Sequence, residues 1–172
     1  MVSDDRPAYL DVPVLTGLAE ATARTWIRYA AEVARKASCL RSRCGSVIVA
    51  ADGAVLATGV NQLPCAGQPS FCRKDQLPED FRSDRTCCMH AEQNALLEAM
   101  ASHPTKVPGA SLYFVRLDAD GLMAPAAAPY CTICSKMALT CGISRFVLLH
   151  ADGIRSYDTF IYNELSFGAP AA

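Results

Sequence analysis

The alternation of hydrophobic and polar residues divides the first third of the chain into a helix and two strands. Residues 18–37 predict a helix, because Trp26, Ala30 and Val33 recur at helical spacing with Ala37 while charged residues occupy another face. Residues 44–51 and 54–60 predict two strands joined at Asp52-Gly53, a pair typical of two-residue hairpin turns. Because their hydrophobic content is nearly continuous, we expect a sheet covered on both faces.

Helices and strands alternate in the rest of the chain. The pattern predicts helices over residues 90–101 and 131–141, the second closed by Gly142, and strands over residues 111–116 and 144–149. Residues 157–164 form either a short helix or a fifth strand. This order predicts a three-layer α/β/α domain with a mixed central sheet of about five strands.

No repeat or boundary divides the chain, so residues 1–172 are expected to form a single domain. Residues 1–15 contain two prolines and no periodicity, which predicts an extended N-terminal arm. Residues 62–86 contain three prolines, two cysteines and several charges without a period. We interpret them as a long loop insertion, and loops of that length are usually functional or locally stapled.

Composition narrows the class of protein. With 51% hydrophobic and 19% charged residues among 172, disorder is excluded. The net charge of −1 argues against a partner such as long nucleic acid but leaves a small anionic ligand open. No hydrophobic run approaches the roughly 20 residues that span a bilayer, and the first residues lack a secretory pattern, so we expect a cytoplasmic location and no membrane partner. Nine cysteines, odd in number and uneven in spacing, favour metal binding over a disulfide framework.

The candidate chemistry lies at the starts of two predicted helices. His90 and Glu92 open one helix, and Cys131 and Cys134 open the other. One imidazole and two thiolates suit zinc, and three protein ligands leave the fourth position open for water. A carboxylate beside that water is what hydrolytic chemistry requires. A closed structural site would need a fourth ligand, for which Cys87 or Cys88 is available.

These residues resemble the zinc-dependent cytidine and deoxycytidylate deaminase superfamily, whose signature is H-x-E followed by P-C-x-x-C. The resemblance covers roughly residues 26–150 and includes residues 37–49, 59–64, 90–96 and 131–143. His-Ala-Glu-Gln-Asn-Ala at residues 90–95 is similar to the deoxycytidylate branch, in which Asn94 is typical. The resemblance implies a cytidine-deaminase-like fold and a homo-oligomer.

The resemblance also implies a role for each site residue. His90, Cys131 and Cys134 would hold one catalytic zinc, and Glu92 would pass a proton from water to the ring nitrogen and then to the departing amine. The leading substrate is dCMP, converted to the uracil nucleotide and ammonia. Asn61 would bond the sugar, unless it is only a turn residue, and Ala91 would offer backbone groups to the base. Candidate cations for a phosphate are Arg41, Arg43, Arg73, Lys74, Arg82 and Arg85.

Two departures from the family pattern keep other substrates open. Tyr130 stands between Pro129 and Cys131, where it either stacks on the base or simply packs, and the segment before Cys131 is longer than in a compact deoxycytidylate deaminase. The alternatives are a free nucleoside, a free base such as cytosine or guanine, a modified pyrimidine, or a base within a polynucleotide. A zinc-stapled interaction domain is the alternative that is not an enzyme.

A second, structural zinc is a further hypothesis for the long loop. Its ligands would be Cys65, Cys72, Cys87 and Cys88, whose spacing matches no standard ligand pattern.

Overall fold

A mixed sheet forms the middle layer of the protein. The structure, a computed structural model, describes residues 8–39, 41–64, 70–78 and 88–168. Five strands lie in the order β2-β1-β3-β5-β6, and the short β4 pairs with β3. Strands β3 and β5 are parallel and the other pairs are antiparallel, which confirms the predicted mixed sheet. The strands are β1 (Arg43–Val49), β2 (Val55–Val60), β3 (Ser111–Leu117), β4 (Met123–Ala124), β5 (Arg145–His150) and β6 (Gly153–Asp158).

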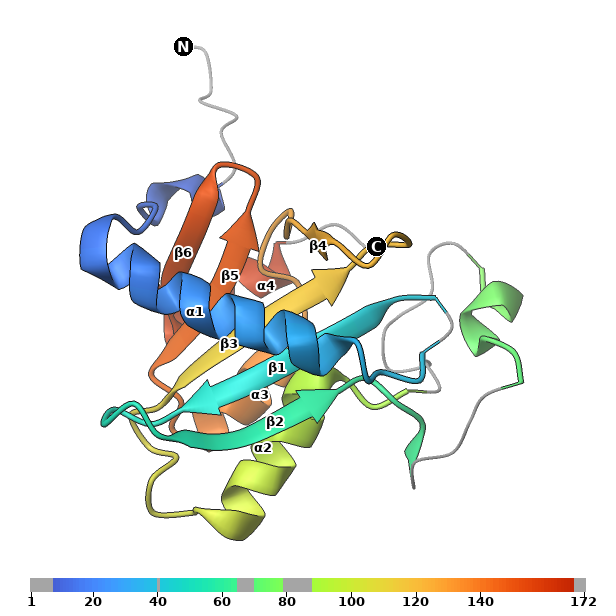
Figure 1. Ribbon diagram of the computed structural model, residues 1–172, viewed down its shortest axis with the longest axis horizontal. Helices are drawn as coiled ribbons and strands as arrows, with labels where there is room; N and C mark the ends of the chain where they lie inside the picture. The colour runs from blue at the N-terminus through green and yellow to red at the C-terminus, as the bar shows by residue number, and fades with distance from the viewer. Residues whose placement is uncertain (1–7, 40, 65–69, 79–87, 169–172) are drawn as a thin grey trace.

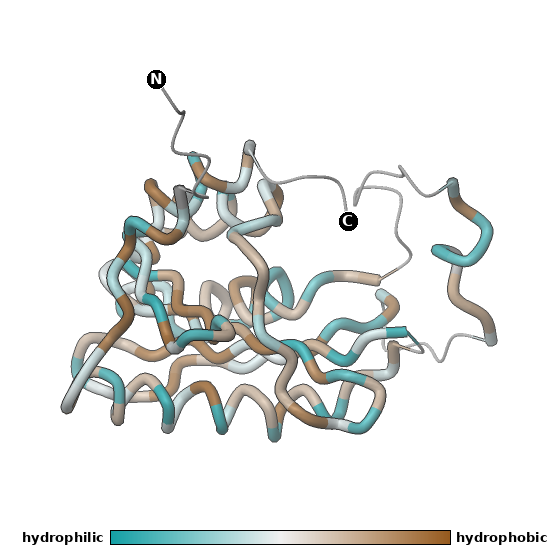
Figure 2. The backbone as a smooth tube through the Cα atoms, turned by 90° about the horizontal axis from the view of Figure 1, so that it is seen from above, coloured by the Kyte–Doolittle hydropathy of each residue, from teal (hydrophilic) through white to brown (hydrophobic). Residues whose placement is uncertain are grey.

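Helices cover both faces of this sheet, so the three layers are confirmed (Figure 1). Helix α1 (Gly17–Ala34) packs on one face, and α2 (Ala91–Ser102), α3 (Thr132–Thr140) and α4 (Thr159–Phe167) pack on the other. Seen from above, α1 alternates hydrophobic and hydrophilic residues along its length, as expected for a helix with one buried face (Figure 2). None of the described helices is long and apolar enough to cross a membrane.

Two glycines allow helices to approach the sheet closely. A Cβ at Gly45 would lie 2.2 Å from the carbonyl oxygen of Ala30 in α1. On the opposite face, a Cβ at Gly59 would lie 2.2 Å from the carbonyl oxygen of Ala91, the first residue of α2. The start of α2 is therefore held directly against β2.

The structure differs from the sequence expectations at several boundaries. Helix α1 ends at Ala34 rather than at residue 37, and Ile27 is fully buried while Trp26 is only partly buried, against Tyr113. The C-terminal segment forms both a strand and a helix, because a two-residue turn at Ala151 and Asp152 leads into β6 and the Asp158 side chain caps α4. The two-residue strand β4 lies within residues 118–129, which we expected to be a loop.

The ends of the long loop meet at a β-bridge. Gln62 and Met89 exchange two backbone hydrogen bonds, of 3.3 and 2.9 Å. Between them the structure describes a short 3-10 helix, η3 (Arg73–Gln76). The N-terminal arm forms a 3-10 turn, η1 (Ala8–Asp11), and then runs beside β6, where Val14 bridges Arg155.

Candidate metal centre

Two helix N-termini meet at the candidate zinc ligands. His90 is the N-cap residue of α2, and its backbone N–H donates to the Gln93 side chain at 2.9 Å. Cys131 is the N-cap residue of α3, and its sulfur accepts a hydrogen bond from the Cys134 N–H at 3.4 Å. Each ligand-bearing turn is thus fixed by its own cap, as the sequence predicted for residues at helix starts.

The geometry of this group suits a zinc ion. The His90 Nδ1 atom lies 3.3 Å from both the Cys131 and the Cys134 sulfur. Zn–S and Zn–N bonds of about 2.3 and 2.0 Å at a tetrahedral angle would place ligand atoms roughly 3.5 Å apart. All three ligand atoms lie within 4.8 Å of one another, and they form the one such group among the described residues. Among the described residues Cys88 is not a member of it, and Cys87, the other expected fourth ligand, lies outside the described residues.

Electrostatics favour a thiolate at Cys131. Hydrogen bonds from the Cys134 thiol and from His90 lower the pKa of Cys131, and the same contact raises the pKa of Cys134, which burial raises further. One thiol is therefore already disposed to lose its proton, and the other shares a proton with it. Bound zinc would replace the shared proton, because the metal binds the thiolate form.

Glu92 lies beside the three ligands and is only 5% exposed. Burial raises the pKa of its carboxyl to about 7, an effect that the nearby His90 opposes. A carboxyl with a pKa near neutrality can both accept and return a proton at ordinary pH. The arrangement therefore combines a zinc-binding group with a carboxyl able to carry protons.

Comparison with known families identifies the protein family of this chain. The model of the cytidine and deoxycytidylate deaminase zinc-binding region matches residues 20–150. The chain belongs to this family. The deaminase has a fold similar to the apo dCMP deaminase of cyanophage S-TIM5, with a TM-score of 0.53 and 22% identity over 85% of this chain and 93% of that one.

A second solved structure supports the same fold. It is the cytidine deaminase of Burkholderia pseudomallei, with a TM-score of 0.54 and 20% identity over 81% of this chain and 94% of the other. A comparison with curated proteins gives no match. At these identities the solved structures support the cytidine-deaminase-like fold, and they do not separate the nucleotide branch from the nucleoside branch.

The three expected substrate contacts differ in their surroundings. The Asn61 side chain accepts from the Cys44 N–H and donates to the Ser42 carbonyl, both at 2.7 Å, so its amide holds the start of β1. Ala91 is fully buried at the start of α2, and Tyr130 is 36% exposed. Their roles toward a substrate stay predictions, and for Asn61 the structure adds a role in holding β1.

Two residues near the site were missed by the sequence reasoning. Cys44 lies near Glu92, whose charge contributes to the raised pKa of the Cys44 thiol after the larger effect of burial. Arg116 is the direct cross-strand partner of Cys44, and its side chain is exposed. A charged residue within the otherwise hydrophobic Leu-Tyr-Phe-Val-Arg-Leu of β3 was the signal that could have identified Arg116.

Part of the long loop also reaches the site. The Lys74 ammonium in η3 is close enough to lower the pKa of His90, although hydrogen bonding to Cys131 raises that pKa overall. Arg41 pairs with Asp75 of the same 3-10 helix at 3.1 Å. The side chains of Arg73, Arg82 and Arg85 lie outside the described part of the chain.

The proposed second zinc stays a prediction. Cys65 and Cys87 lie outside the described residues, while Cys72 is buried and Cys88 is half-buried.

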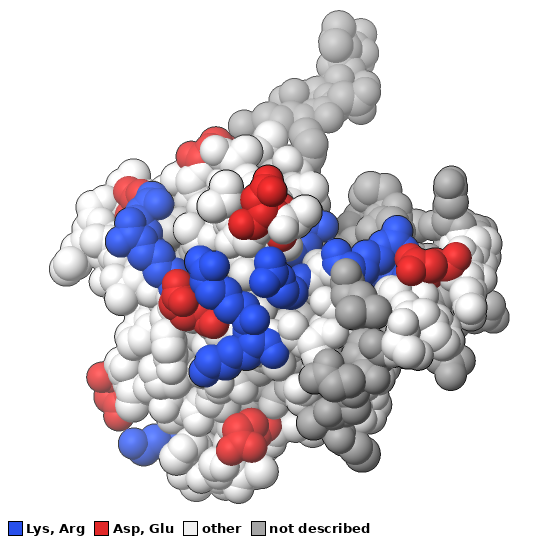
Figure 3. All heavy atoms as spheres, turned by 45° about the vertical axis from the view of Figure 1, so that its right-hand side comes forward, with Lys and Arg blue, Asp and Glu red and all other residues white. Residues whose placement is uncertain are grey.

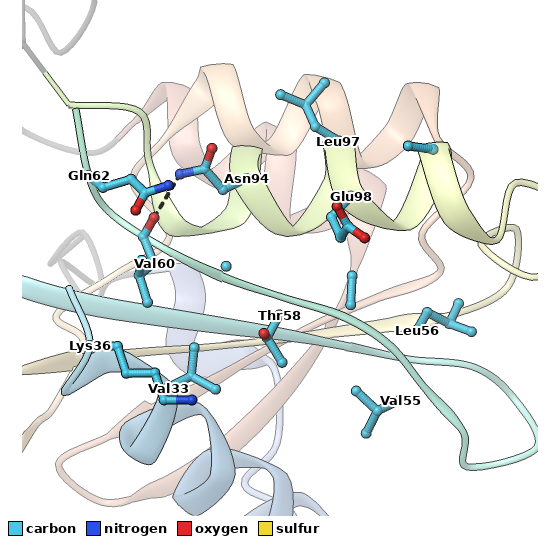
Figure 4. Close-up of a pocket in the computed structure, with 13 residues that line it drawn as sticks. Val33, Lys36, Val55, Leu56, Thr58, Val60, Gln62, Asn94, Leu97 and Glu98 are labelled. Atoms are coloured by element: carbon cyan, nitrogen blue, oxygen red, sulfur yellow. Dashed lines mark hydrogen bonds between the residues drawn. The ribbon is translucent and has the colours of Figure 1, made fainter. Parts of the chain in front are cut away.

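A separate groove of about 980 Å³ lies at the edge of the sheet (Figure 4). It is lined by the edge strand β2, the end of α1 and the outer face of α2, and none of the three candidate zinc ligands contributes to it. Asn94 is at its margin, where its side chain donates to the Val60 carbonyl oxygen at 2.7 Å. Asn94 therefore ties α2 to β2.

Proposed function

We propose that this deaminase hydrolyses the 4-amino group of a cytosine nucleotide, with dCMP as its preferred substrate. The observation that carries the proposal is Glu92, buried beside a group of one histidine and two cysteines whose geometry suits zinc. A closed structural zinc site has no use for a buried carboxylate that is not a ligand. The arrangement thus supports hydrolysis over an interaction domain.

The residues divide the chemistry between them. His90, Cys131 and Cys134 would hold the metal, which when bound lowers the pKa of a water molecule toward neutrality. Glu92 takes a proton from the attacking water and delivers it to the ring nitrogen N3. As the new bond from oxygen to C4 forms and the bond from C4 to the amino nitrogen breaks, Glu92 passes a second proton to that nitrogen. The products are the uracil compound and ammonia.

Cations beside the site support a nucleotide over a nucleoside. Arg116 points to the same face of β3 as Leu112 and Phe114, which is the face covered by α2 and α3. Among the described residues no carboxylate forms an ion pair with Arg116. Lysine and arginine side chains also gather in a band on the face shown in Figure 3, which is on the side of the sheet covered by α1 and does not contain the candidate metal ligands. We infer that Arg116 and Lys74 meet the substrate phosphate, because Lys74 lies near His90 and Arg116 lies beside Cys44, which is itself near Glu92.

Ammonia release from a panel of substrates tests the reaction. The panel contains dCMP, dCTP, deoxycytidine, cytidine, cytosine, guanine and a cytosine-containing oligonucleotide, each incubated with zinc-loaded protein. We expect kcat/KM for dCMP to exceed that for deoxycytidine by at least about tenfold, the value of one lost charged hydrogen bond. Faster deamination of deoxycytidine or of a free base would reject the nucleotide and support the alternative substrates.

A pair of arginine variants tests the phosphate contact. Arg116→Ala should raise KM for dCMP about tenfold or more, while leaving KM for deoxycytidine unchanged, because only dCMP carries the phosphate. Arg145→Ala is the control, since Arg145 is also exposed but lies at the opposite end of the parallel pair β3 and β5. Equal effects of Arg116→Ala on both substrates would show that Arg116 does not bind the phosphate.

A homo-oligomer and a cytoplasmic location stay predictions.

A further inference from the structure

His90, the histidine among the candidate zinc ligands, is held on both sides by the end of β2. Before it, Met89 exchanges two backbone hydrogen bonds with Gln62, of 3.3 and 2.9 Å. After it, the Asn94 side chain donates to the Val60 carbonyl oxygen at 2.7 Å (Figure 4). The main chain around His90 is therefore fixed to the sheet, and the His90 N–H is left for another partner.

Gln93 provides that partner and also reaches a second helix. Its side-chain oxygen accepts a hydrogen bond from the His90 N–H at 2.9 Å. Because an N–H can only donate, the amide oxygen must face His90, and the amide NH2 group then faces the other way. There it donates to the Met137 sulfur at 3.7 Å. One half-buried side chain thus joins the start of α2 to the middle of α3.

The two helices that Gln93 joins carry all three candidate ligands. His90 is the N-cap residue of α2, and Cys131 is the N-cap residue of α3, with Cys134 in the first turn. The His90 Nδ1 atom lies 3.3 Å from each sulfur, so the ligand geometry depends directly on how the start of α2 lies against α3. Because metal ligands tolerate shifts of only about 0.2 Å, a contact that fixes this arrangement should affect metal affinity.

The contact of Gln93 goes beyond an ordinary helix cap. Glu or Gln is common at the third position of a helix, because its side chain can reach back to the N-cap N–H. An ionised glutamate would accept that N–H equally well, but it has no donor for the Met137 sulfur. Gln93 uses both of its polar groups, one on each of the helices that carry ligands.

We propose that Gln93 is a positioning residue, which holds the His90 main chain in a fixed relation to α3 and so sets the zinc affinity of the site. Like the proposed function, this inference rests on the assignment of a metal site to His90, Cys131 and Cys134, but it does not depend on the identity of the substrate. Groups that orient metal ligands typically change metal affinity about 10- to 100-fold when they are removed.

Two substitutions of Gln93 separate its hydrogen bonds from its bulk. Gln93→Leu removes both polar contacts and keeps a side chain of similar size, and we expect it to bind zinc about tenfold more weakly. Gln93→Glu keeps an acceptor for the His90 N–H, and we expect it to recover most of the lost zinc affinity. Zinc affinity is measured by competition with a chromophoric chelator, and unfolding by urea reports stability separately.

Asp158→Ala is the matched control, because it removes the cap of a different helix. The Asp158 side chain accepts from the Phe160 and Ile161 N–H groups at the start of α4, at 3.0 and 3.4 Å. Asp158 pairs with Arg145 where β5 begins, at the end of the sheet away from the metal ligands. We expect a loss of stability similar to that of Gln93→Leu, with zinc affinity unchanged.

Cobalt(II) in place of zinc adds a spectroscopic readout. The thiolate-to-metal charge-transfer band should change in Gln93→Leu and not in Asp158→Ala, because only the first alters how the ligands are arranged. Should Gln93→Leu fail to fold, Met137→Leu decides by the same two measurements. It removes the sulfur that holds the Gln93 amide, so we expect weaker zinc binding and a changed band.

The failures of the two levels are distinguishable. A wild-type protein that binds no zinc overturns the metal assignment, the proposed function and this inference together. Wild-type zinc binding with unchanged affinity and spectrum in Gln93→Leu, or in Met137→Leu where that variant decides, overturns the inference alone.

Two further outcomes would also overturn the role of Gln93. Equal losses of zinc affinity in Gln93→Leu and Asp158→Ala would mean that the effect follows general stability. A loss in Gln93→Glu as large as that in Gln93→Leu would mean that the acceptor for the His90 N–H does not matter.

Discussion

Replacing Gly59 of β2 by alanine should displace the start of α2, whose N-cap residue is the candidate metal ligand His90. A Cβ at this position would lie 2.2 Å from the Ala91 carbonyl oxygen and 2.4 Å from the Ala95 backbone nitrogen. Both atoms belong to the helix backbone, so no side-chain rotation can relieve the contact. Bringing 2.2 Å to an ordinary contact of 3.4 Å requires α2 to move by about 1 Å relative to β2.

The consequences can be estimated from that displacement. Overpacking of a core contact costs about 1–3 kcal/mol, so we expect the free energy of unfolding to fall by about 3 kcal/mol. Ala91 directly follows His90, and metal ligands tolerate shifts of only about 0.2 Å. A misplacement of about 1 Å in a catalytic site can cost about 100-fold in rate. Gly59→Ala should therefore lose zinc affinity and at least about 100-fold in kcat/KM.

Gly45→Ala is the matched control. Its Cβ would meet the Ala30 carbonyl oxygen at 2.2 Å and the Ala34 nitrogen at 2.6 Å, but in α1 on the other face of the sheet. We expect a similar loss of stability in urea unfolding with zinc affinity retained in chelator competition. The reasoning is refuted if both variants lose zinc affinity equally, or if Gly59→Ala keeps wild-type zinc affinity and turnover.

Two further predictions concern single side chains. Glu92→Gln should retain zinc and lose about 10²- to 10⁴-fold in kcat, because the amide cannot carry a proton; near-wild-type ammonia release would exclude this role. Burial lowers the pKa of His150 below its ordinary value of 6.5, an effect that Arg155 strengthens and Asp152 opposes. The folded state therefore takes up the proton less readily than the unfolded chain, so stability is lost as the pH falls below about 6.5. In urea unfolding the difference in stability between wild type and His150→Phe should shrink from pH 7.5 to about 5.5, and a constant difference would contradict this assignment.

Local patterns were enough to predict most of the elements and the three candidate metal ligands that the structure brings together. Period and turn residues depend on the chain within a few positions, so a hairpin around Asp52-Gly53 and the helix end at Gly142 could be predicted without neighbours. The turn itself spans residues 51–53 rather than the two residues expected, because the Ala50 N–H bonds the Ala54 carbonyl oxygen. His90 and Cys131 could be placed at helix starts for the same reason. The structure places them as expected and brings their side chains together with Cys134.

Where an element is short or its burial depends on its neighbours, the sequence predicted its type, bounds or buried residues less accurately. Residues 157–164 contain the end of β6 and most of α4, so a single interpretation as helix or strand covered two elements. The two-residue β4 exists only because it pairs with β3. The burial of Ile27 in preference to Trp26 depends on how α1 is rotated on the sheet, which periodicity alone defines only within one position.

The sequence by itself determined the family chemistry, because one histidine, two cysteines and a glutamate at helix starts restrict both the metal and the reaction. Only the tertiary structure decided what surrounds that chemistry. Strand register sets Arg116 beside Cys44, although they are far apart in the chain. Packing of α4 on α3 brings the Asn163 side chain to the Ser135 hydroxyl, directly after Cys134. Such contacts join segments distant in sequence, and they arise from register and helix packing, which no local pattern encodes.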